Sequence, residues 1–341
     1  MKRIFIIMPI FLFAMAGTVS GSETAGSGDM QVKGLFQGWY SYDQKANDMD
    51  GFAVRRAEIE FSGNPHPHAG WFVVLDPAKP FNLHTSAQGG SRITGQVDPK
   101  TMILKNVGIV LSGWDRFPGL SFQIGQFEPP FGMEGTASSR ELETIERAAQ
   151  SEVLGWSDYY DVGVMAELRR GFWTAYLGIF NGEGPNSSEA NRDKDVAARV
   201  VFEAAPGIHF GVAGYHGHGT ADRILNEHWG LEASWARMPW SVKAEYAAGH
   251  GATSETVSPG KQTVYTQAGY YFNPKFQGVV RFDWWEPDTG VGGNIQTETR
   301  VGLNYLIDGH KFKVQADYSL HNQEGSVRSY SIARTALQVG F

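Results

Sequence analysis

The chain has 341 residues, no cysteine and a formal net charge of −7, with 29 basic residues against 36 acidic ones. The lack of cysteine excludes a disulfide framework, a thiol catalyst and a thiolate metal site, and the acidic balance argues against a general nucleic-acid-binding protein. Aromatic residues and glycine are abundant (10 Trp, 13 Tyr, 21 Phe and 42 Gly), whereas the mean hydropathy is only −0.29. Such a composition is typical of a membrane β-barrel, in which only alternate residues face lipid, although a soluble β-sandwich can share it.

The N-terminal segment has the organisation of an export signal. Lys2 and Arg3 precede an apolar run over 4–16, and small and polar residues follow. The run is shorter than the roughly 20 residues of a membrane-spanning helix, so we predict a signal peptide over 1–21, cleaved after Ala16 or Gly21. Residues 22–30 form a short polar linker, and 31–341 form the barrel domain. Loss of the two basic residues leaves 27 basic against 36 acidic residues, a net charge of −9.

Apolar and polar residues then alternate in sixteen runs, each close to the roughly 9–11 residues that a tilted strand needs to cross a bilayer. An even number of strands is expected of a closed antiparallel barrel whose two ends lie on one side of the membrane. The predicted strands cover 31–43, 52–63, 68–76, 102–112, 119–127, 159–169, 171–180, 195–204, 207–215, 227–237, 240–248, 263–273, 275–285, 296–306, 311–320 and 331–341.

The connections between these runs alternate between short and long. The short ones carry turn residues, as in 64–67, where two prolines occur, and in 170–171. The long ones include 77–100 and 128–158, which is the longest. Short turns on one side and long loops on the other are typical of outer-membrane barrels, and a soluble sandwich has no reason to alternate so regularly. At sixteen strands the lumen is too wide for side chains to fill, which predicts an aqueous channel.

The alternation also identifies the two faces of the sheet. Trp229, Leu231 and Trp235 share one face of their strand, and Glu232 lies on the other. The final run, 331–341, alternates in the same way and ends in an aromatic residue. We therefore expect an outer face in contact with outer-membrane lipid and an inner face that is polar.

The most specific sequence is the segment 124–134, which reads Ile-Gly-Gln-Phe-Glu-Pro-Pro-Phe-Gly-Met-Glu. It resembles the signature of the phosphate-selective porin (porin O and P) family of Gram-negative outer membranes. The Ser or Thr pair and the Glu-Arg pair that commonly follow this signature are matched by Ser138-Ser139 and Glu146-Arg147, and two weaker similarities are Val54 to Ala57 and 178–184. The resemblance implies a homotrimer of sixteen-stranded barrels, with the third long loop folded into each lumen, and passive diffusion of small hydrophilic solutes and ions, phosphate and other anions by default.

The composition of the third long loop fits a role in narrowing the channel. Pro129-Pro130 stops the preceding strand, and 139–150 has a helix-forming composition, so we expect a short helix on the inner wall. The segment 128–158 holds seven acids against two arginines, a net charge of −5. The charged residues predicted to line the constriction are Glu128, Glu134, Arg140, Glu141, Glu143, Glu146 and Arg147.

The inner wall is predicted to carry charges of both signs, some of which will pair across strands. Carboxylate rings favour cations and arginine or lysine favours anions, so the acidic loop opposes the anion preference that the family implies. We predict weak selectivity, and a cation- or neutral-solute pore or a non-conducting barrel with loop-mediated binding remain alternatives. The predicted pore-wall charges are Arg56, Glu58, Glu60, Arg169, Arg199, Lys243, Arg281, Arg300, Lys313 and Arg334.

Nothing in the sequence predicts an enzyme, a cofactor or a metal site. The histidine pairs His216/His218 and His66/His68 lie in loops or turns without an identifiable third ligand, so a surface loop is the simpler interpretation. No Gly-x-Ser-x-Gly segment or phosphate-binding glycine motif is present. The expected location is the outer membrane of a Gram-negative bacterium, with lipid and small ions or solutes as partners.

Overall fold

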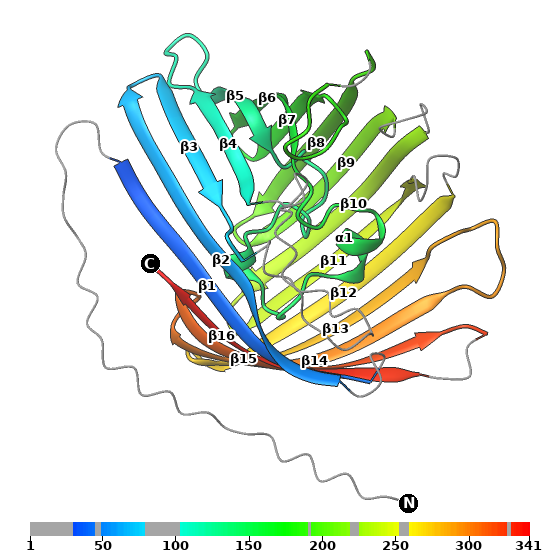
Figure 1. The fold of residues 1–341 in the computed structure, drawn as a ribbon. Helices are drawn as coiled ribbons and strands as arrows, with labels where there is room; N and C mark the ends of the chain where they lie inside the picture. The colour runs from blue at the N-terminus through cyan, green and yellow to red at the C-terminus, as the bar shows by residue number, and fades with distance from the viewer. Residues whose placement is uncertain are drawn as a thin grey trace, which may run out of the picture.

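Sixteen antiparallel strands close into one barrel, in which β1 pairs with both β2 and β16 (Figure 1). The computed structural model describes residues 30–44, 49–78, 103–189, 192–218, 225–251, 259–325 and 329–341. The predicted signal peptide and all but the last residue of the linker lie outside these ranges. Among the described residues, no helix is long and apolar enough to cross a membrane.

The predicted all-β barrel of sixteen strands is confirmed, with most strand ends within three residues of those expected. The strands are β1 Met30–Asp43, β2 Met49–His66, β3 Ala69–Leu75, β4 Leu104–Leu111, β5 Leu120–Phe127, β6 Asp161–Arg170, β7 Trp173–Phe180, β8 Asp195–Ala205, β9 Ile208–His218, β10 Leu225–Arg237, β11 Trp240–His250, β12 Gly260–Asn273, β13 Phe276–Glu286, β14 Gln296–Asp308, β15 Phe312–Gln323 and β16 Tyr330–Gly340.

One short turn was predicted too early. Residues 64–66 were assigned to a turn because of Pro65, but β2 continues through them and His66 pairs with Ala69. The register shifts between Gly63 and His66, and such an irregularity can accommodate a proline because no ladder hydrogen bond is needed there. The hairpin therefore closes later than the proline suggests.

A β-bulge in β2 was not predicted, and it changes which residues face the lumen. Gln37 pairs with Arg56 and the next residue, Gly38, pairs with Val54, so Arg55 is the extra residue. A bulge of this kind re-aims a side chain because two residues oppose one on the partner strand. As a result Arg55 and Arg56 both reach the same glutamate of the third loop, Glu146.

The two faces of the sheet differ as the alternation predicts. On β10, Trp229 and Leu231 are exposed on the outer face, whereas Glu232 on the inner face is buried. The same division holds on β13, where Val280 is exposed and Arg281 is buried. The outer face is therefore apolar around the barrel, and the polar side chains lie inside.

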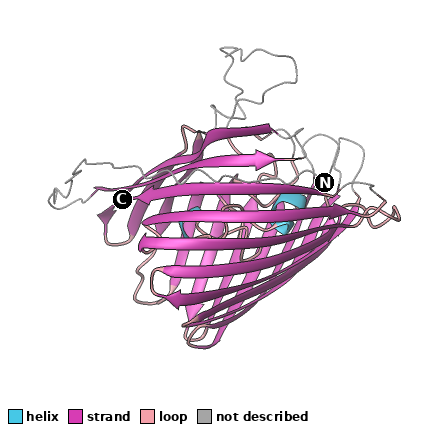
Figure 2. Ribbon diagram, turned by 90° about the horizontal axis from the view of Figure 1, so that it is seen from below, coloured by secondary structure: helices cyan, strands magenta, loops and turns pink. Residues whose placement is uncertain are grey.

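The third long loop, residues 128–160, lies inside the barrel, as predicted. Figures 1 and 2 show its helix α1 (Ala149–Val153) enclosed by the strands. A single turn of 3-10 helix, η2 (Ser139–Glu141), precedes it. The predicted helix over 139–150 is otherwise wrong. Its backbone groups bond to side chains of the wall instead of to one another: the carbonyl of Leu142 accepts from Lys313, and the N–H of Ile145 donates to Asp317.

An apolar core fixes the loop to one side of the lumen. Phe131 and Trp156 of the loop stack with ring centroids 4.7 Å apart. They belong to a buried cluster that includes the small wall residues Ala197, Ala213 and Ala247. Small side chains at these inward positions leave room for the two rings, so the wall of β8 to β11 is shaped to receive the loop.

Candidate functional site

The Pro-Phe-Gly turn at the start of the loop is built around a buried carboxylate of the wall. Glu245 of β11 is only 3 % exposed. Its oxygens accept hydrogen bonds from the backbone N–H groups of Met133 and Glu134, both at 3.1 Å, and from Gln150 at 2.8 Å. A Cβ on Gly132 would lie 2.3 Å from Glu245 Oε1, so any other residue there would have to displace this carboxyl group. The backbone N–H groups of the motif therefore form a nest, a small concave group of donors, that holds a carboxyl group supplied by the protein itself.

Further along the loop, Glu143 is held by neutral donors and one lysine. Its carboxylate accepts from Ser241 at 2.7 Å and from Gln267 and Gln277 at 2.6 and 2.7 Å, and Lys243 lies 3.5 Å away. Burial acts to raise the pKa of Glu143, but Lys243 and these donors outweigh it and lower it. Glu143 is therefore an anchor of the loop in its ionised form.

Glu146 ties the loop to the opposite wall. Arg55 binds both of its oxygens, at 2.8 and 3.1 Å, and Arg56 lies 3.9 Å away. Burial alone would raise the pKa of Glu146, but the charges of the two arginines lower it to about 2. The bidentate geometry makes this a strong and oriented contact.

Because the folded pKa of Glu146 lies below its ordinary value, its contribution to stability is present above about pH 4.5 and is lost as the pH falls toward 2. Glu146→Gln is therefore expected to destabilise the barrel by about 3 kcal/mol at pH 7. Urea unfolding of both proteins between pH 8 and pH 2 measures the difference, which we expect to be constant down to about pH 5 and to shrink below it. A difference that vanishes already at pH 6 would contradict this role.

Backbone carbonyls of the loop are bound by basic and amide side chains of β13 to β15. Arg281 donates to the carbonyls of Glu146 and Arg147 at 2.9 and 3.0 Å. Lys313 donates to the carbonyl of Leu142 at 2.6 Å, and Asn304 donates to that of Glu143 at 2.8 Å. The paired residues are more than 130 positions apart in the sequence. These long-range contacts hold the loop in its irregular conformation, in place of hydrogen bonds within the loop.

The return limb of the loop, which leads back to β6, is held by a basic wall residue in the same way as Glu143 is held by Lys243 and Glu146 by Arg55. Lys105 of β4 lies 3.2 Å from Asp158 of the loop and 2.7 Å from Glu58 of β2. Within the loop, Arg147 donates to the carbonyls of Glu134 and Ala137 at 2.5 and 2.7 Å. Thus three loop carboxylates, those of residues 143, 146 and 158, each have a basic partner on the wall.

The predicted site residues divide into buried and water-accessible groups. Four predicted wall cations are almost inaccessible: Arg56 and Arg281 at 0 %, Lys313 at 1 % and Arg300 at 3 %. Arg300 binds Glu298 and Asp317 rather than open lumen. The buried predicted loop residues are Glu134, Glu143 and Arg147, and the accessible or half-accessible predicted residues are Glu58, Glu60, Glu128, Arg140, Glu141, Glu146, Arg169, Arg199, Lys243 and Arg334.

Several functional residues were missed from the sequence. Arg55 was missed because the alternation places it on the outer face, and only the bulge turns it inward. Lys105 and the wall glutamines Gln267 and Gln277 face inward by the alternation, but nothing in sequence indicates which loop residue each would bind. The histidine His216, set aside as a metal ligand, instead hydrogen-bonds Glu227 on the neighbouring strand. No group of three metal-ligating side chains occurs in the part of the chain that the structure describes.

Comparisons with known proteins agree with this architecture. The model of the family "Phosphate-selective porin O and P" matches residues 29–222, more than half of the chain. Porin O of Pseudomonas aeruginosa is 24 % identical over 308 residues, which cover 74 % of this chain and 66 % of that protein. The chain thus spans just under two thirds of the length of this relative.

Solved structures of porins share the fold at low sequence identity. An anion-selective porin from Comamonas acidovorans aligns with a TM-score of 0.64 at 9 % identity, over 92 % of this chain and 100 % of that one. OmpF of Salmonella typhi aligns with a TM-score of 0.66 at 12 % identity, over 92 % and 98 % of the two chains. The outer membrane channel DcaP of Acinetobacter baumannii gives 0.61 at 12 % identity, over 95 % and 100 %.

The fold defines an outer-membrane β-barrel of the porin type. The chain belongs to the phosphate-selective porin O and P family.

Proposed function

We propose that the protein is an outer-membrane porin, through which small hydrophilic solutes and ions diffuse passively along their gradients. The observation that carries this proposal is a closed sixteen-strand barrel with a polar lumen that a folded-in loop narrows. Lipid admits no unpaired backbone, so the sheet closes, and a barrel of this size leaves room for water. The chemistry needs no cofactor, metal or covalent intermediate, and we propose no enzymatic activity.

Solute entry into liposomes tests this function directly. Vesicles that contain the refolded protein are expected to swell in isotonic solutions of small sugars, and to swell more slowly as the sugar becomes larger. Vesicles without protein are the control. Folded barrels that admit no sugar of any size, and no ions, would instead favour a non-conducting barrel that binds ligands through its long loops.

We further propose that the pore is weakly selective, because the wall neutralises much of the acidic loop. Three of the seven loop acids have basic wall partners, Glu143 with Lys243, Glu146 with Arg55, and Asp158 with Lys105. A paired, desolvated carboxylate presents little net charge to a passing ion. The net charge of −5 counted along the loop therefore overstates its pull on cations, and the anion default of the family is only partly opposed.

Accessibility to water distinguishes the charges that set selectivity from those that hold the loop. Lys243 and Lys313 are both lumen-facing lysines near the Glu143 anchor, but the Lys243 side chain is 26 % exposed and Lys313 is 1 % exposed. Lys243→Gln is expected to move the reversal potential in a KCl gradient toward cation preference, whereas Lys313→Gln is expected to move it less than half as far. Equal shifts would show that exposure does not identify the pore-lining charges.

The location that we propose is the outer membrane of a Gram-negative bacterium. We propose that residues 1–21 are removed as a signal peptide during export.

We also propose that the protein is a homotrimer. Strands β3, β4, β5 and β7 have only 7 or 8 residues, fewer than the roughly 9–11 that a tilted strand needs to cross a bilayer. This sector of the barrel is better covered by neighbouring protein than by lipid, and mass measurement in detergent tests the trimer.

A further inference from the structure

His228 of β10 lies beneath both limbs of the third loop. Its ring centroid is 5.9 Å from that of Phe131, on the outgoing limb, and 5.5 Å from that of Trp156, on the return limb. The imidazole is 3 % exposed. A Cβ on Gly249 of the neighbouring strand would lie 1.8 Å from the carbonyl oxygen of Glu227 and 2.7 Å from His228 Cδ2. The glycine therefore allows the close approach of the two strands and also leaves space for the ring. The wall thus places a titratable ring directly under the aromatic stack that holds the loop.

Neither ring nitrogen of His228 has a hydrogen-bond partner among the described residues. The contrast with His209 is clear, because that ring donates to or accepts from Glu232 at 2.7 Å. A buried polar atom without a partner is costly, and a buried charge without a partner costs much more. The neutral form of His228 is therefore compatible with the packed cluster, and the protonated form is not.

The ionisable groups that face His228 would not compensate the positive charge of a protonated imidazole. They are Lys261 of β12, His250 of β11 and Tyr215 of β9, and none of them is a carboxylate. The carboxylate of Glu227 lines the same pocket, but it bonds to His216 and not to His228. Lys261 is close: a Cβ on Gly251 would lie 3.2 Å from Lys261 Nζ and 3.3 Å from His228 Nε2, so both nitrogens border the same small space. The Lys261 ammonium also donates to the carbonyl of Val153, at the end of α1. Protonation of His228 would place a second cation beside Lys261.

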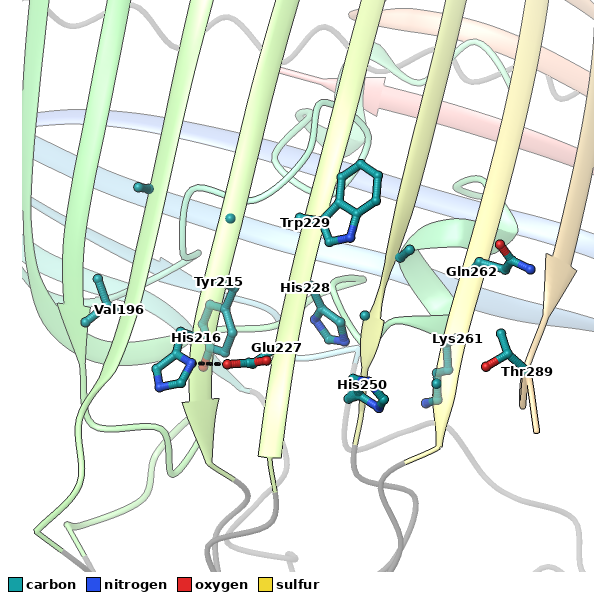
Figure 3. Close-up of a pocket in the computed structure, with 15 residues that line it drawn as sticks. Val196, Tyr215, His216, Glu227, His228, Trp229, His250, Lys261, Gln262 and Thr289 are labelled. Atoms are coloured by element: carbon teal, nitrogen blue, oxygen red, sulfur yellow. Dashed lines mark hydrogen bonds and ion pairs between the residues drawn. The ribbon is translucent and has the colours of Figure 1, made fainter.

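Protons have a short route to the ring. A pocket of about 740 Å³ is lined by His228 together with Tyr215, His250 and Lys261, near the ends of β9 to β12 that carry the long loops (Figure 3). The figure shows these side chains coming from adjacent strands around one hollow. His228 is therefore buried against the loop but lies next to a space that water can enter.

We propose that His228 is a proton-operated latch of the third loop. When the imidazole is neutral, the stack of Phe131 and Trp156 rests on it and the loop is docked. When it is protonated, the stack lifts so that water reaches the ring, and α1 and the return limb loosen. The Glu146 anchor keeps its charge down to low pH, so the movement is confined to this side of the loop. The consequence for conduction rests on the proposed pore, whereas the movement itself does not.

The absence of native cysteine allows a direct test of the movement. Ser151 of α1 is 2 % exposed, and its hydroxyl has no partner among the described residues, so Ser151→Cys adds a single buried thiol with little disturbance. Its reaction with 4,4′-dithiodipyridine, which reacts at acid pH, reports undocking of the helix. We expect the rate to rise by up to tenfold for each pH unit as the pH falls toward the midpoint of the transition, and to level off below it.

Two further substitutions in the Ser151→Cys background isolate His228. His228→Phe keeps an aromatic ring without a titratable group, and it is expected to react slowly and evenly from pH 7 to pH 4. If that variant does not fold, His228→Gln serves the same purpose, with heat-modifiable gel mobility as the check on folding. Lys261→Met removes the neighbouring cation, so the docked loop tolerates a protonated His228 better, and the ratio of the labelling rate at pH 4 to that at pH 7 is expected to fall severalfold. The ratio is the measure because loss of the Lys261 contact with Val153 changes the rate at both pH values alike.

The latch is overturned if the parent protein shows no acid-dependent labelling, if His228→Phe or His228→Gln shows the same rise as the parent, or if Lys261→Met leaves the ratio of the acid rate to the neutral rate unchanged or raises it. A single-channel recording on the same proteins separates this result from the proposed function. A conducting barrel without acid labelling refutes the latch alone, and a silent barrel with acid labelling refutes the pore alone.

Discussion

Replacement of Gly132 by alanine is expected to undock the third loop, whereas replacement of Gly155 by alanine is expected to leave it docked. Both glycines lie in the loop with positive φ, +72° and +77°, so both substitutions carry a conformational cost of about 1–2 kcal/mol. Only at Gly132 does the new Cβ meet another atom, Glu245 Oε1 at 2.3 Å, because nothing lies within 4 Å of a Cβ at Gly155. The alanine at 132 therefore expels the carboxylate from the nest.

Single-channel recording measures the difference between the two variants. Gly132→Ala is expected to give a larger and noisier conductance than the parent, since a loop that leaves the wall no longer narrows the lumen in a fixed way. Gly155→Ala is expected to give the conductance of the parent. Equal behaviour of the two variants would show that the contact with Glu245 does not determine the position of the loop.

Removal of the Glu245 carboxylate is expected to have a comparable effect from the side of the wall. Three donors lose their acceptor in Glu245→Ala, and a buried donor left without an acceptor costs about 1–3 kcal/mol. Glu245→Gln is expected to be intermediate, because the amide keeps one acceptor oxygen but turns its own N–H groups toward donors. Both changes are expected to lower the urea midpoint and increase the open-channel noise.

A matched control for Glu245 is available on β8. Glu203 also points into the lumen, but its side chain is 59 % exposed and its ion-pair partner is His209, not the loop. Glu203→Ala is expected to leave both the urea midpoint and the noise unchanged. A loss of stability as large as that of Glu245→Ala would mean that any lumen carboxylate supports the barrel, and that the nest has no special role.

The strands could be predicted from the sequence because lipid outside the barrel and water inside it require apolar and polar residues to alternate along each strand. Val280 must face lipid and its neighbour Arg281 must not, and this constraint repeats along every strand. It fails where the backbone departs from regular pairing. The bulge at Arg55 and the late hairpin after His66 depend on register between strands, which the sequence of one strand does not specify.

The interior of the loop was predicted less well, for a related reason. Its composition over 139–150 favours a helix, yet wall residues far away in sequence, such as Lys313 and Asn304, bind the carbonyls that a helix would use. The net charge counted along the loop is misleading for the same reason, because Glu146 and Asp158 pair with basic residues of β2 and β4 that the count leaves out. Local propensity and local charge are overridden here by long-range contacts.

The position of the loop itself could be anticipated from the motif, and the structure gives the physical reason. The prolines at 129 and 130 follow the end of β5 at Phe127, Phe131 enters the apolar cluster, and Gly132 allows the approach of Glu245. Each residue type is needed for a separate contact in one turn. The motif therefore specifies how the loop enters the lumen, and it says little about which solute passes.

The measurement that tests this account most directly is the reversal potential of single channels in a planar bilayer under a KCl gradient, followed by addition of phosphate. We predict a steady ohmic conductance, a reversal potential far from the limits of ideal anion or cation selectivity, and only weak block by phosphate. A reversal potential near the chloride limit with strong phosphate block would contradict the proposed neutralisation of wall and loop. A folded barrel that shows no conductance would contradict the pore itself.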